Sequence, residues 1–235
     1  MQNLGEALTF YVVFLFSTTL HEAAHAWAAK RGGDLTAYHG GQVSLDPMPH
    51  IRREPFGMVV LPIISVLISG WPFGFASAPY DPNWAMRHPK RAAGMALAGP
   101  AANLLLVIAA GILLRAGSAA GVFQAPESVG FGRVAEAAAA AGAVWESVAT
   151  VVSVFFSLNL LLAVFNLLPL PPLDGSGALP LVLSPDASRR YQQFLWSNPA
   201  LGWLGIFLAW QLVDVVFHPV FLGAVNLLYP DVWYG

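Results

Sequence analysis

Residues 7–29 read ALTFYVVFLFSTTLHEAAHAWAA and place three ionisable side chains inside an apolar run. A helix of about 23 residues is roughly 35 Å long, which is enough to cross a membrane hydrocarbon core of about 30 Å. The run contains no Lys, Arg or Asp, and its ionisable residues are His21, Glu22 and His25. Because such groups are costly inside a membrane, they mark a functional site by default.

The three ionisable residues form the pattern His-Glu-x-x-His. On a helix His21 and His25 lie on one face, where both imidazoles can bind one Zn²⁺, and Glu22 lies beside them as a candidate base for a metal-activated water. The alternative is two hydrogen-bonded histidines and a salt-bridged glutamate in an ordinary core. The membrane setting argues against that alternative, so the pattern predicts a metallohydrolase.

The composition predicts an integral membrane protein of the all-α polytopic class. The chain is 57% hydrophobic and 10% charged, and its mean hydropathy is positive. Four runs are long enough to span a bilayer, and we expect helices at 7–29, 92–114, 144–168 and 200–217. His218-Pro219 is a plausible end for the last one.

The other segments are expected to support this bundle. The apolar run 56–76 is interrupted by two prolines and two glycines, which predicts a re-entrant or interfacial segment. We expect short extended or β segments near 36–48 and 169–174, and we interpret residues 134–143 as an extension of the helix at 144–168. The chain is predicted to form a single membrane-embedded domain over 1–235, with core motifs in 10–180 and a C-terminal helical region in 190–235.

A catalytic zinc site usually takes three protein ligands, so a third one is needed. The chain has no cysteine, which excludes a Cys-based zinc site and a disulfide framework. The best candidate is Asp174, because it follows the proline-rich stretch Pro169–Pro172, which must end the third span. Non-helical chain at membrane depth is tolerated only where it is buried in protein or lines a wet cavity. We therefore expect Asp174 to share a cavity with the two histidines.

Three motifs together resemble the site-2 protease family of intramembrane zinc metalloproteases, in its compact bacterial branch without a PDZ domain. They are His21-Glu22-x-x-His25, Ala98-Gly99-Pro100-x-x-Asn103, and Asn166-x-x-Pro169-x-Pro171-x-Leu173-Asp174-Gly175. The resemblance implies one Zn²⁺ per chain, held by His21, His25 and Asp174, with Glu22 as catalytic base. It also implies that Asn103 and Asn166 line or stabilise the site.

Asn103 and Asn166 are therefore candidate catalytic residues. Either amide could donate a hydrogen bond to the oxyanion or to the substrate backbone. The alternative for each is a hydrogen bond that joins two membrane helices, and for Asn103 the two possibilities are equally favoured.

The topology follows from where the two motifs must meet. His21 is about 10 Å from the Lys30-Arg31 end of its helix, and Asp174 must reach the same depth, so the spans at 7–29 and 144–168 are expected to run parallel. Two parallel spans allow only one crossing between them, and the span at 92–114 supplies it. The run 56–76 therefore cannot cross the membrane. Most basic residues fall on the metal-site side in this arrangement, which predicts a cytoplasmic active-site face. The resemblance to the bacterial branch implies the inner (cell) membrane of a bacterium as the location.

Two other functions fit part of the pattern. A membrane metal-ion transporter would use the same ligands as a transit site, and a non-proteolytic metal-binding scaffold would need no base. We favour peptide hydrolysis of single-span membrane-protein substrates, with the lipid bilayer as surroundings and a membrane partner as a possible regulator. The sequence has no basic stripe of the kind that indicates nucleic-acid binding. The oligomeric state is open.

Overall fold

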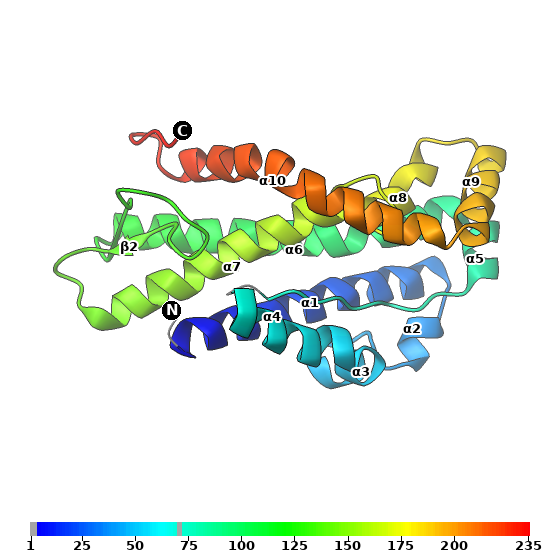
Figure 1. Cartoon of the computed structure of the whole chain (residues 1–235), viewed down its shortest axis with the longest axis horizontal. Coiled ribbons are helices and arrows are strands. Elements are labelled where there is room, and N and C mark those ends of the chain that lie inside the picture. Colours follow the sequence, from blue (N-terminus) through cyan, green and yellow to red (C-terminus); the bar gives the residue numbers. More distant parts are fainter. Residues whose placement is uncertain (1–3, 70–71) are drawn as a thin grey trace.

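The computed structural model of this protein describes residues 4–69 and 72–235. Among these residues, four helices are long and apolar enough to cross a membrane, which confirms the predicted all-α membrane fold. They are α1 (Leu4–Gly32), α6 (Pro89–Ala119), α7 (Ala143–Leu167) and α10 (Ala200–Leu228). Figure 1 shows them along the long axis of the molecule, with α1 and α7 running in one direction and α6 and α10 in the other.

The last helix is longer than the sequence predicts. α10 continues through Pro219 to Leu228, so the predicted end near residue 217 is wrong. Proline lacks the N–H that continues a helix, but membrane helices tolerate it where neighbouring groups satisfy the freed carbonyl. Pro100 likewise lies inside α6, whereas Pro89 occupies its first turn, where no N–H is needed.

The 56–76 run enters the bundle as a helix and turns back. It begins with the π-helical turn η1 (Phe56–Val60) and continues as α4 (Leu61–Ser69), which is far too short to span a membrane. The chain then returns toward α5 (Pro82–Arg87), as Figure 1 shows. The amide of Phe75 donates to the carbonyl of Gly57 at 3.1 Å, so the two limbs lie against each other. The two described limbs, 56–69 and 72–76, therefore lie side by side, which fits the predicted re-entrant or interfacial segment.

The strand expected within 36–48 is absent from this described region. Two short helices, α2 (Thr36–His39) and α3 (Pro47–Arg53), lie at its ends, and turns and bends connect them over 40–46. Asp46 caps α3 by accepting a hydrogen bond from the amide of Met48, and Pro47 fits the first helical position. These local signals favour a helix, and the expectation of a β segment there was wrong, although Asp46 itself is extended.

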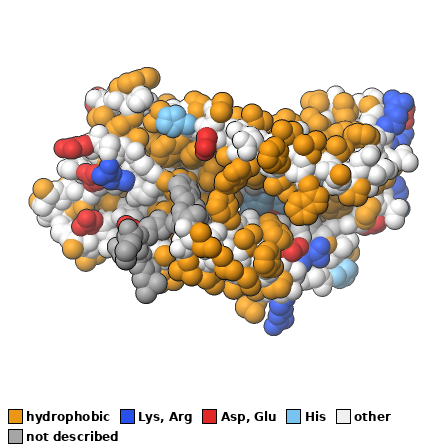
Figure 2. Space-filling model, in the orientation of Figure 1, with side chains coloured by type: hydrophobic (Ala, Val, Ile, Leu, Met, Phe, Trp, Pro, Cys, Tyr) orange, Lys and Arg blue, Asp and Glu red, His pale blue; other side chains and the backbone are white. Residues whose placement is uncertain are grey.

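The described segment at 169–173 also forms turns rather than a strand. The amide of Leu173 donates to the carbonyl of Leu170 at 2.9 Å, although Leu173 itself is extended. Three short helices follow this loop and pack against α6: α8 (Asp174–Ala178), η2 (Leu179–Leu181) and α9 (Pro185–Ser197). Figure 2 shows that Lys and Arg atoms are concentrated near the end of the molecule where α9 lies.

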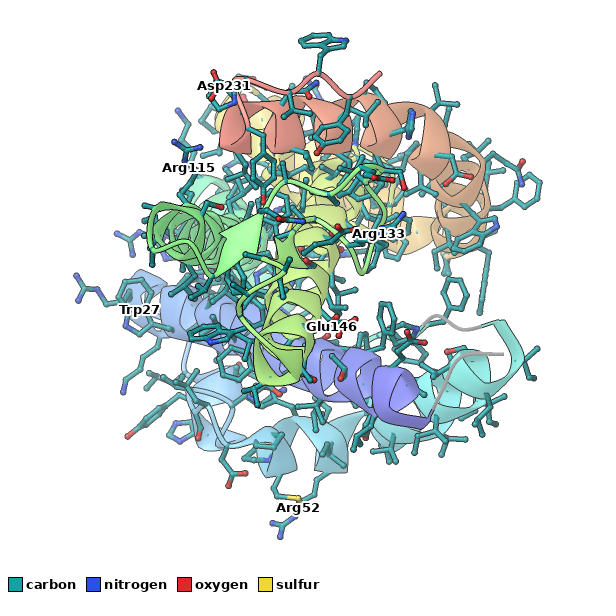
Figure 3. All side chains as sticks on the ribbon, turned by 90° about the vertical axis from the view of Figure 1, so that its left-hand side faces the viewer. Trp27, Arg52, Arg115, Arg133, Glu146 and Asp231 are labelled. Atoms are coloured by element: carbon teal, nitrogen blue, oxygen red, sulfur yellow. The ribbon has the colours of Figure 1, made fainter. Side chains whose placement is uncertain are left out.

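A small β-hairpin lies at the opposite end of the molecule. β1 (Phe123–Gln124) pairs antiparallel with β2 (Glu136–Ala137), so the expectation that 134–143 extends α7 was wrong. Gly142, at φ 81°, precedes α7 in a conformation that favours glycine, and the helix begins after it. Figure 3 looks onto this end, with Arg115, Arg133 and Glu146 projecting around the hairpin.

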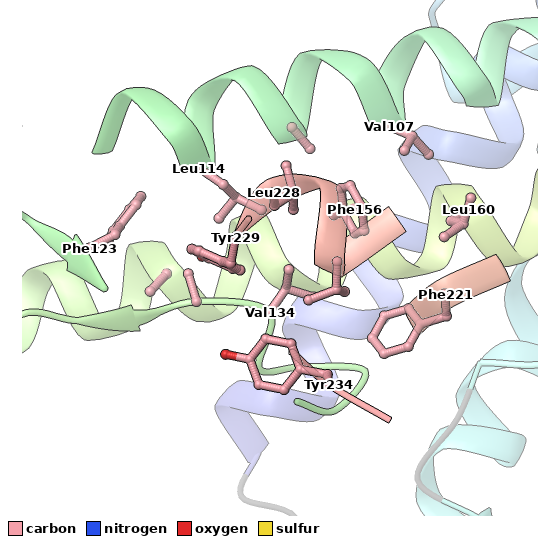
Figure 4. Close-up of a cluster of buried hydrophobic side chains, with 14 residues drawn as sticks. Val107, Leu114, Phe123, Val134, Phe156, Leu160, Phe221, Leu228, Tyr229 and Tyr234 are labelled. Carbon is pink, nitrogen blue, oxygen red and sulfur yellow. The ribbon is translucent and has the colours of Figure 1, made fainter. Parts of the chain in front are cut away.

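A cluster of 14 buried side chains supports the hairpin end, as Figure 4 shows. It joins Leu114 of α6 and Phe156 of α7 to the C-terminal residues Tyr229 and Tyr234. The hydroxyl of Tyr234 also donates to the carbonyl of Pro126 at 2.6 Å. This apolar core packs α6, α7 and the end of α10 together at one end of the molecule.

Candidate active site

The His-Glu-x-x-His motif lies on the C-terminal half of α1 and faces the interior of the bundle. His21, Glu22 and His25 are each only 6% exposed. One turn of helix separates the two histidines, so their Nε2 atoms point into the same space, 3.0 Å apart. The donor atoms of the three residues lie within 4.8 Å of one another.

Asp174 reaches this space from the first residue of α8. Its Oδ2 lies 3.1 Å from Nε2 of His21 and 3.3 Å from Nε2 of His25. The next residue, Gly175, lies so close to the end of α7 that a Cβ would be 2.2 Å from the carbonyl oxygen of Leu167. Because only glycine permits this approach, the turn brings the carboxylate of Asp174 back toward α1.

The three donor atoms fit a divalent metal ion. Zinc binds nitrogen and oxygen at about 2.0–2.2 Å, so neighbouring ligands of a tetrahedral ion are about 3.3 Å apart. The three separations here are 3.0, 3.1 and 3.3 Å. The carboxylates of Glu22 and Asp174, beside two imidazoles, also give this buried cluster a negative charge, which a cation would neutralise. The donor set therefore suits one zinc ion.

The other ring nitrogen of each histidine has a partner of its own. Nδ1 of His21 lies 2.5 Å from Oδ1 of Asn103, and Nδ1 of His25 lies 2.8 Å from the carbonyl oxygen of Met95. Metal-binding histidines commonly donate this second N–H to a carbonyl or carboxylate, which orients the ring and frees Nε2 for the metal. Both partners belong to α6, so α6 orients both histidine rings of α1.

Gly99 of α6 leaves room beside these donor atoms. A Cβ at this position would lie 2.4 Å from Nε2 of His25 and 2.5 Å from Nε2 of His21. That position is close to a metal–ligand distance, so a methyl group would compete with the ion for the same space. Gly99 was part of a motif in the sequence, but its role in the site was not predicted.

The two predicted asparagines lie in different surroundings. Asn103 is fully buried and contacts His21, as described above. Asn166, near the end of α7, is half-buried, and its Nδ2 donates to the carbonyl of Leu162 one turn earlier. The structure thus places Asn103 against His21, and it gives Asn166 a hydrogen bond within its own helix. A catalytic role for Asn166 remains a prediction.

Asn159 of α7 was missed by the sequence reasoning. It is fully buried and accepts a hydrogen bond from Nδ2 of Asn103 at 2.8 Å. The available signal was a lone amide in the middle of an apolar helix, since polar residues at membrane depth usually join helices or serve a site.

The site is reached from one face of the bundle. The side chain of Asp174 is 20% exposed, whereas both histidine side chains are 7% exposed. Figure 2 shows a hollow in the centre of an apolar face, with histidine atoms at its floor. The ring of Phe73, from the limb 72–76, contacts Trp210 of α10 at a centroid distance of 4.8 Å.

Comparisons with known proteins agree with this geometry. A model of peptidase family M50 matches residues 9–200. A Bacillus subtilis protein, "Putative zinc metalloprotease YwhC", is 33% identical over 185 residues, which cover 77% of this chain and 72% of that protein.

Two mycobacterial proteins named Rip2, with the same description, are also similar. The one from Mycolicibacterium smegmatis is 31% identical over 80% of this chain and 62% of its own length. The one from Mycobacterium tuberculosis H37Rv is 30% identical over 97% of this chain and 77% of its own length. No solved structure matches the chain. The family match covers all four motif residues described on α1 and α8, and the chain therefore belongs to peptidase family M50, the site-2 protease family of intramembrane zinc metalloproteases.

Proposed function

We propose that this protein hydrolyses peptide bonds within or near the transmembrane segments of single-span membrane proteins, using one zinc ion held by His21, His25 and Asp174. The observation that carries the proposal is the set of three donor atoms within 3.3 Å of one another, inside a bundle of membrane-spanning helices. A single domain over residues 1–235 would hold the whole site.

Each residue of the proposed site has a different role in the reaction. Zinc, when bound, lowers the pKa of water toward about 7 and polarises the substrate carbonyl. Glu22, beside the ligands, takes the proton from the attacking water and later gives it to the leaving amine. Asn166, near the end of α7, is the candidate donor to the substrate backbone or the oxyanion. Asn103 acts indirectly, because its oxygen holds the ring of His21.

The site is expected to lie nearer the cytoplasm. α1 ends at Gly32, which is 7 to 11 residues beyond the two histidines, so the metal ligands lie roughly 10–16 Å from that end. The basic residues concentrated at the same end favour a cytoplasmic location by the positive-inside rule. The relatives are bacterial, which supports the inner membrane of a bacterium as the location.

The surroundings of the site favour substrates without bulky extramembrane domains. A substrate helix must unwind to expose its scissile amide, and it must reach a carboxylate that is mostly covered. We expect membrane stubs from an earlier cleavage to be cut faster than full-length single-span proteins. Comparing the two in the same liposomes tests this, and equal rates would exclude substrate size as the control.

A transporter receives no support from the described residues. They contain one group of histidines and acids able to hold a metal ion, not a series of such groups along a path through the membrane. The described part of the chain thus offers a single metal centre with an acid beside it, as hydrolysis requires.

The decisive test separates metal binding from proteolysis. Wild-type protein and Glu22→Gln are reconstituted with a single-span substrate, and zinc content and cleavage are both measured. We expect Glu22→Gln to retain zinc but to cleave at least about 10²-fold more slowly, since an amide cannot accept the proton. The control is Glu146→Gln, an exposed glutamate at the start of α7, which should cleave normally. Normal turnover by Glu22→Gln would refute the proposed mechanism.

A further inference from the structure

A chain of buried hydrogen bonds crosses three helices behind the metal ligands. It starts at Nδ1 of His21 in α1, passes through Asn103 in α6, and reaches Asn159 in α7. Nδ2 of Asn159 then donates both to Oγ of Ser17 at 2.9 Å and to the backbone carbonyl of Phe155 at 2.8 Å. Asn103, Asn159 and Ser17 are all 0% exposed.

At the end of this hydrogen-bond chain that is farther from the metal ligands, the orientation of the Asn159 amide is fixed. A backbone carbonyl can only accept hydrogen bonds, so Asn159 must present its NH₂ group to Phe155. Its oxygen is then the only group that it can offer to Asn103. Asn103 must in turn present its own NH₂ group to Asn159 and its oxygen to His21.

The near end of the chain is the imidazole of His21. An amide oxygen opposite Nδ1 can only accept, so the ring must carry its proton on Nδ1. Its Nε2 then keeps a free lone pair, directed at the point that it shares with His25 and Asp174. If Asn103 were reversed, its NH₂ group would favour the other tautomer, in which a proton blocks Nε2.

We propose that Asn159 is a positioning residue of the metal site, which sets the orientation of Asn103 and, through it, the tautomer of His21. This inference rests on the proposed role of His21 as a zinc ligand. A pair of asparagines that merely joined helices would serve equally well in either orientation. Here one end is anchored on a carbonyl and the other on a ring that must accept a metal, so only one orientation serves the site.

The test measures zinc affinity in Asn159→Leu and in the milder Asn159→Ser, whose hydroxyl can donate to the Phe155 carbonyl without reaching Asn103. Loss of a residue that orients a metal ligand typically lowers metal affinity about 10- to 100-fold. We expect that range for Asn103→Ala and about a tenfold loss for each Asn159 variant, measured by competition with a chelating dye. The visible spectrum of the cobalt-loaded protein should change in the same variants, because it reports the geometry of the metal site.

A double variant tests whether Asn159 acts through Asn103. Combining Asn103→Ala with Asn159→Ser should weaken zinc binding no further than Asn103→Ala alone, whereas independent effects would add. Asn226→Leu is the matched control, because this amide of α10 makes two hydrogen bonds to the backbone of Tyr234 in the hairpin-end core. It should alter thermal stability but leave zinc affinity and the cobalt spectrum unchanged.

The outcomes are distinguishable. Unchanged zinc affinity in a folded Asn159 variant, or an additive loss in the double variant, would overturn the role of Asn159. Failure of the wild-type protein to bind zinc would instead overturn the proposed function.

Discussion

Gly205 of α10 lies directly against Pro171 in the loop that leads to Asp174. A Cβ at Gly205 would be 1.7 Å from the carbonyl oxygen of Pro171, a separation that no side chain can accommodate. α10 is the least buried of the four spanning helices, with 17% of its most apolar window covered. Although it contributes no predicted ligand, we expect it to influence the metal site through this contact with the loop.

Gly205→Ala should consequently impair catalysis. The methyl group must push the loop or the helix aside, which moves Asp174 relative to the histidines, and a displacement of about 1 Å can reduce a rate about 10²-fold. Gly202→Ala is the control, since a Cβ there would meet only Cδ of Pro172 at 4.0 Å. The measurement is the cleavage rate of each variant in liposomes, and Gly205→Ala should be slower than Gly202→Ala. Equal rates would show that the loop tolerates displacement.

Gly99→Ala should abolish zinc binding. Its methyl group would be placed within 2.5 Å of both histidine Nε2 atoms, where the ion is expected. Gly94→Ala is the control in the same helix, because nothing lies within 4 Å of a Cβ at that position. Zinc content after purification separates the two, with about one ion per chain expected for Gly94→Ala and little for Gly99→Ala. Full zinc occupancy in Gly99→Ala would place the ion elsewhere.

The two ends of the 56–76 run should be accessible from the same side of the membrane. Arg52 and Asn83 are exposed residues that flank the segment, and the hydrogen bond between Phe75 and Gly57 brings its two limbs together. The protein has no cysteine, so Arg52→Cys and Asn83→Cys can be labelled without background. An impermeant thiol reagent should modify both from one side and Ala140→Cys, near the hairpin, from the other. Labelling of the first two from opposite sides would contradict a re-entrant path.

Asp34 should make the stability of the protein sensitive to acid. It follows α1, is 4% exposed, and accepts hydrogen bonds from the amide and hydroxyl of Thr36 and from the amide of Asp81. Burial raises the pKa of its carboxyl, but these three hydrogen bonds outweigh burial and the net pKa is lowered. A lowered folded-state pKa gives stability that is fully present above the unfolded value of about 3.9 and is lost as the pH falls through the folded value.

Asp34→Ala should therefore reduce stability near neutral pH, by roughly 1–3 kcal/mol, and by less once the pH falls below about 4. Thermal unfolding in detergent at several pH values provides the measurement. Asp186→Ala is the control, because its side chain is 77% exposed and pairs with Arg189 one turn away. An Asp34→Ala deficit that does not change between pH 7 and pH 3 would show that the hydrogen bonds do not depend on ionisation.

Much of the site could be read from local sequence. The spacing of His21 and His25 matches a helical turn, so a single helix is enough to put both rings on one face. Asp174 could be singled out because the prolines before it must end a span at membrane depth. Each of these arguments uses only neighbours in the sequence and the low tolerance of a membrane for ionisable groups. The four long apolar helices followed from length and composition in the same way.

The features that were missed depend on contacts between distant segments. Asn159 meets Asn103 and Ser17, which are 56 and 142 residues away, and nothing near Asn159 in the sequence indicates either partner. The importance of Gly99 lies in the side chains opposite it. The errors at 36–48 and at the end of α10 have another cause, because there a helix cap and a tolerated proline outweighed the general expectation.

The donor atoms that converge on one point come from opposite halves of the chain, 153 residues apart between His21 and Asp174. An ion bound there would act as a reversible crosslink between α1 and the segment after α7. A ligand that binds only the folded state adds about 2.7 kcal/mol of stability at a concentration one hundred times its Kd. The cell's supply of zinc would then control the lifetime of the folded enzyme as well as its activity, since chains without the ion would unfold and be degraded more often.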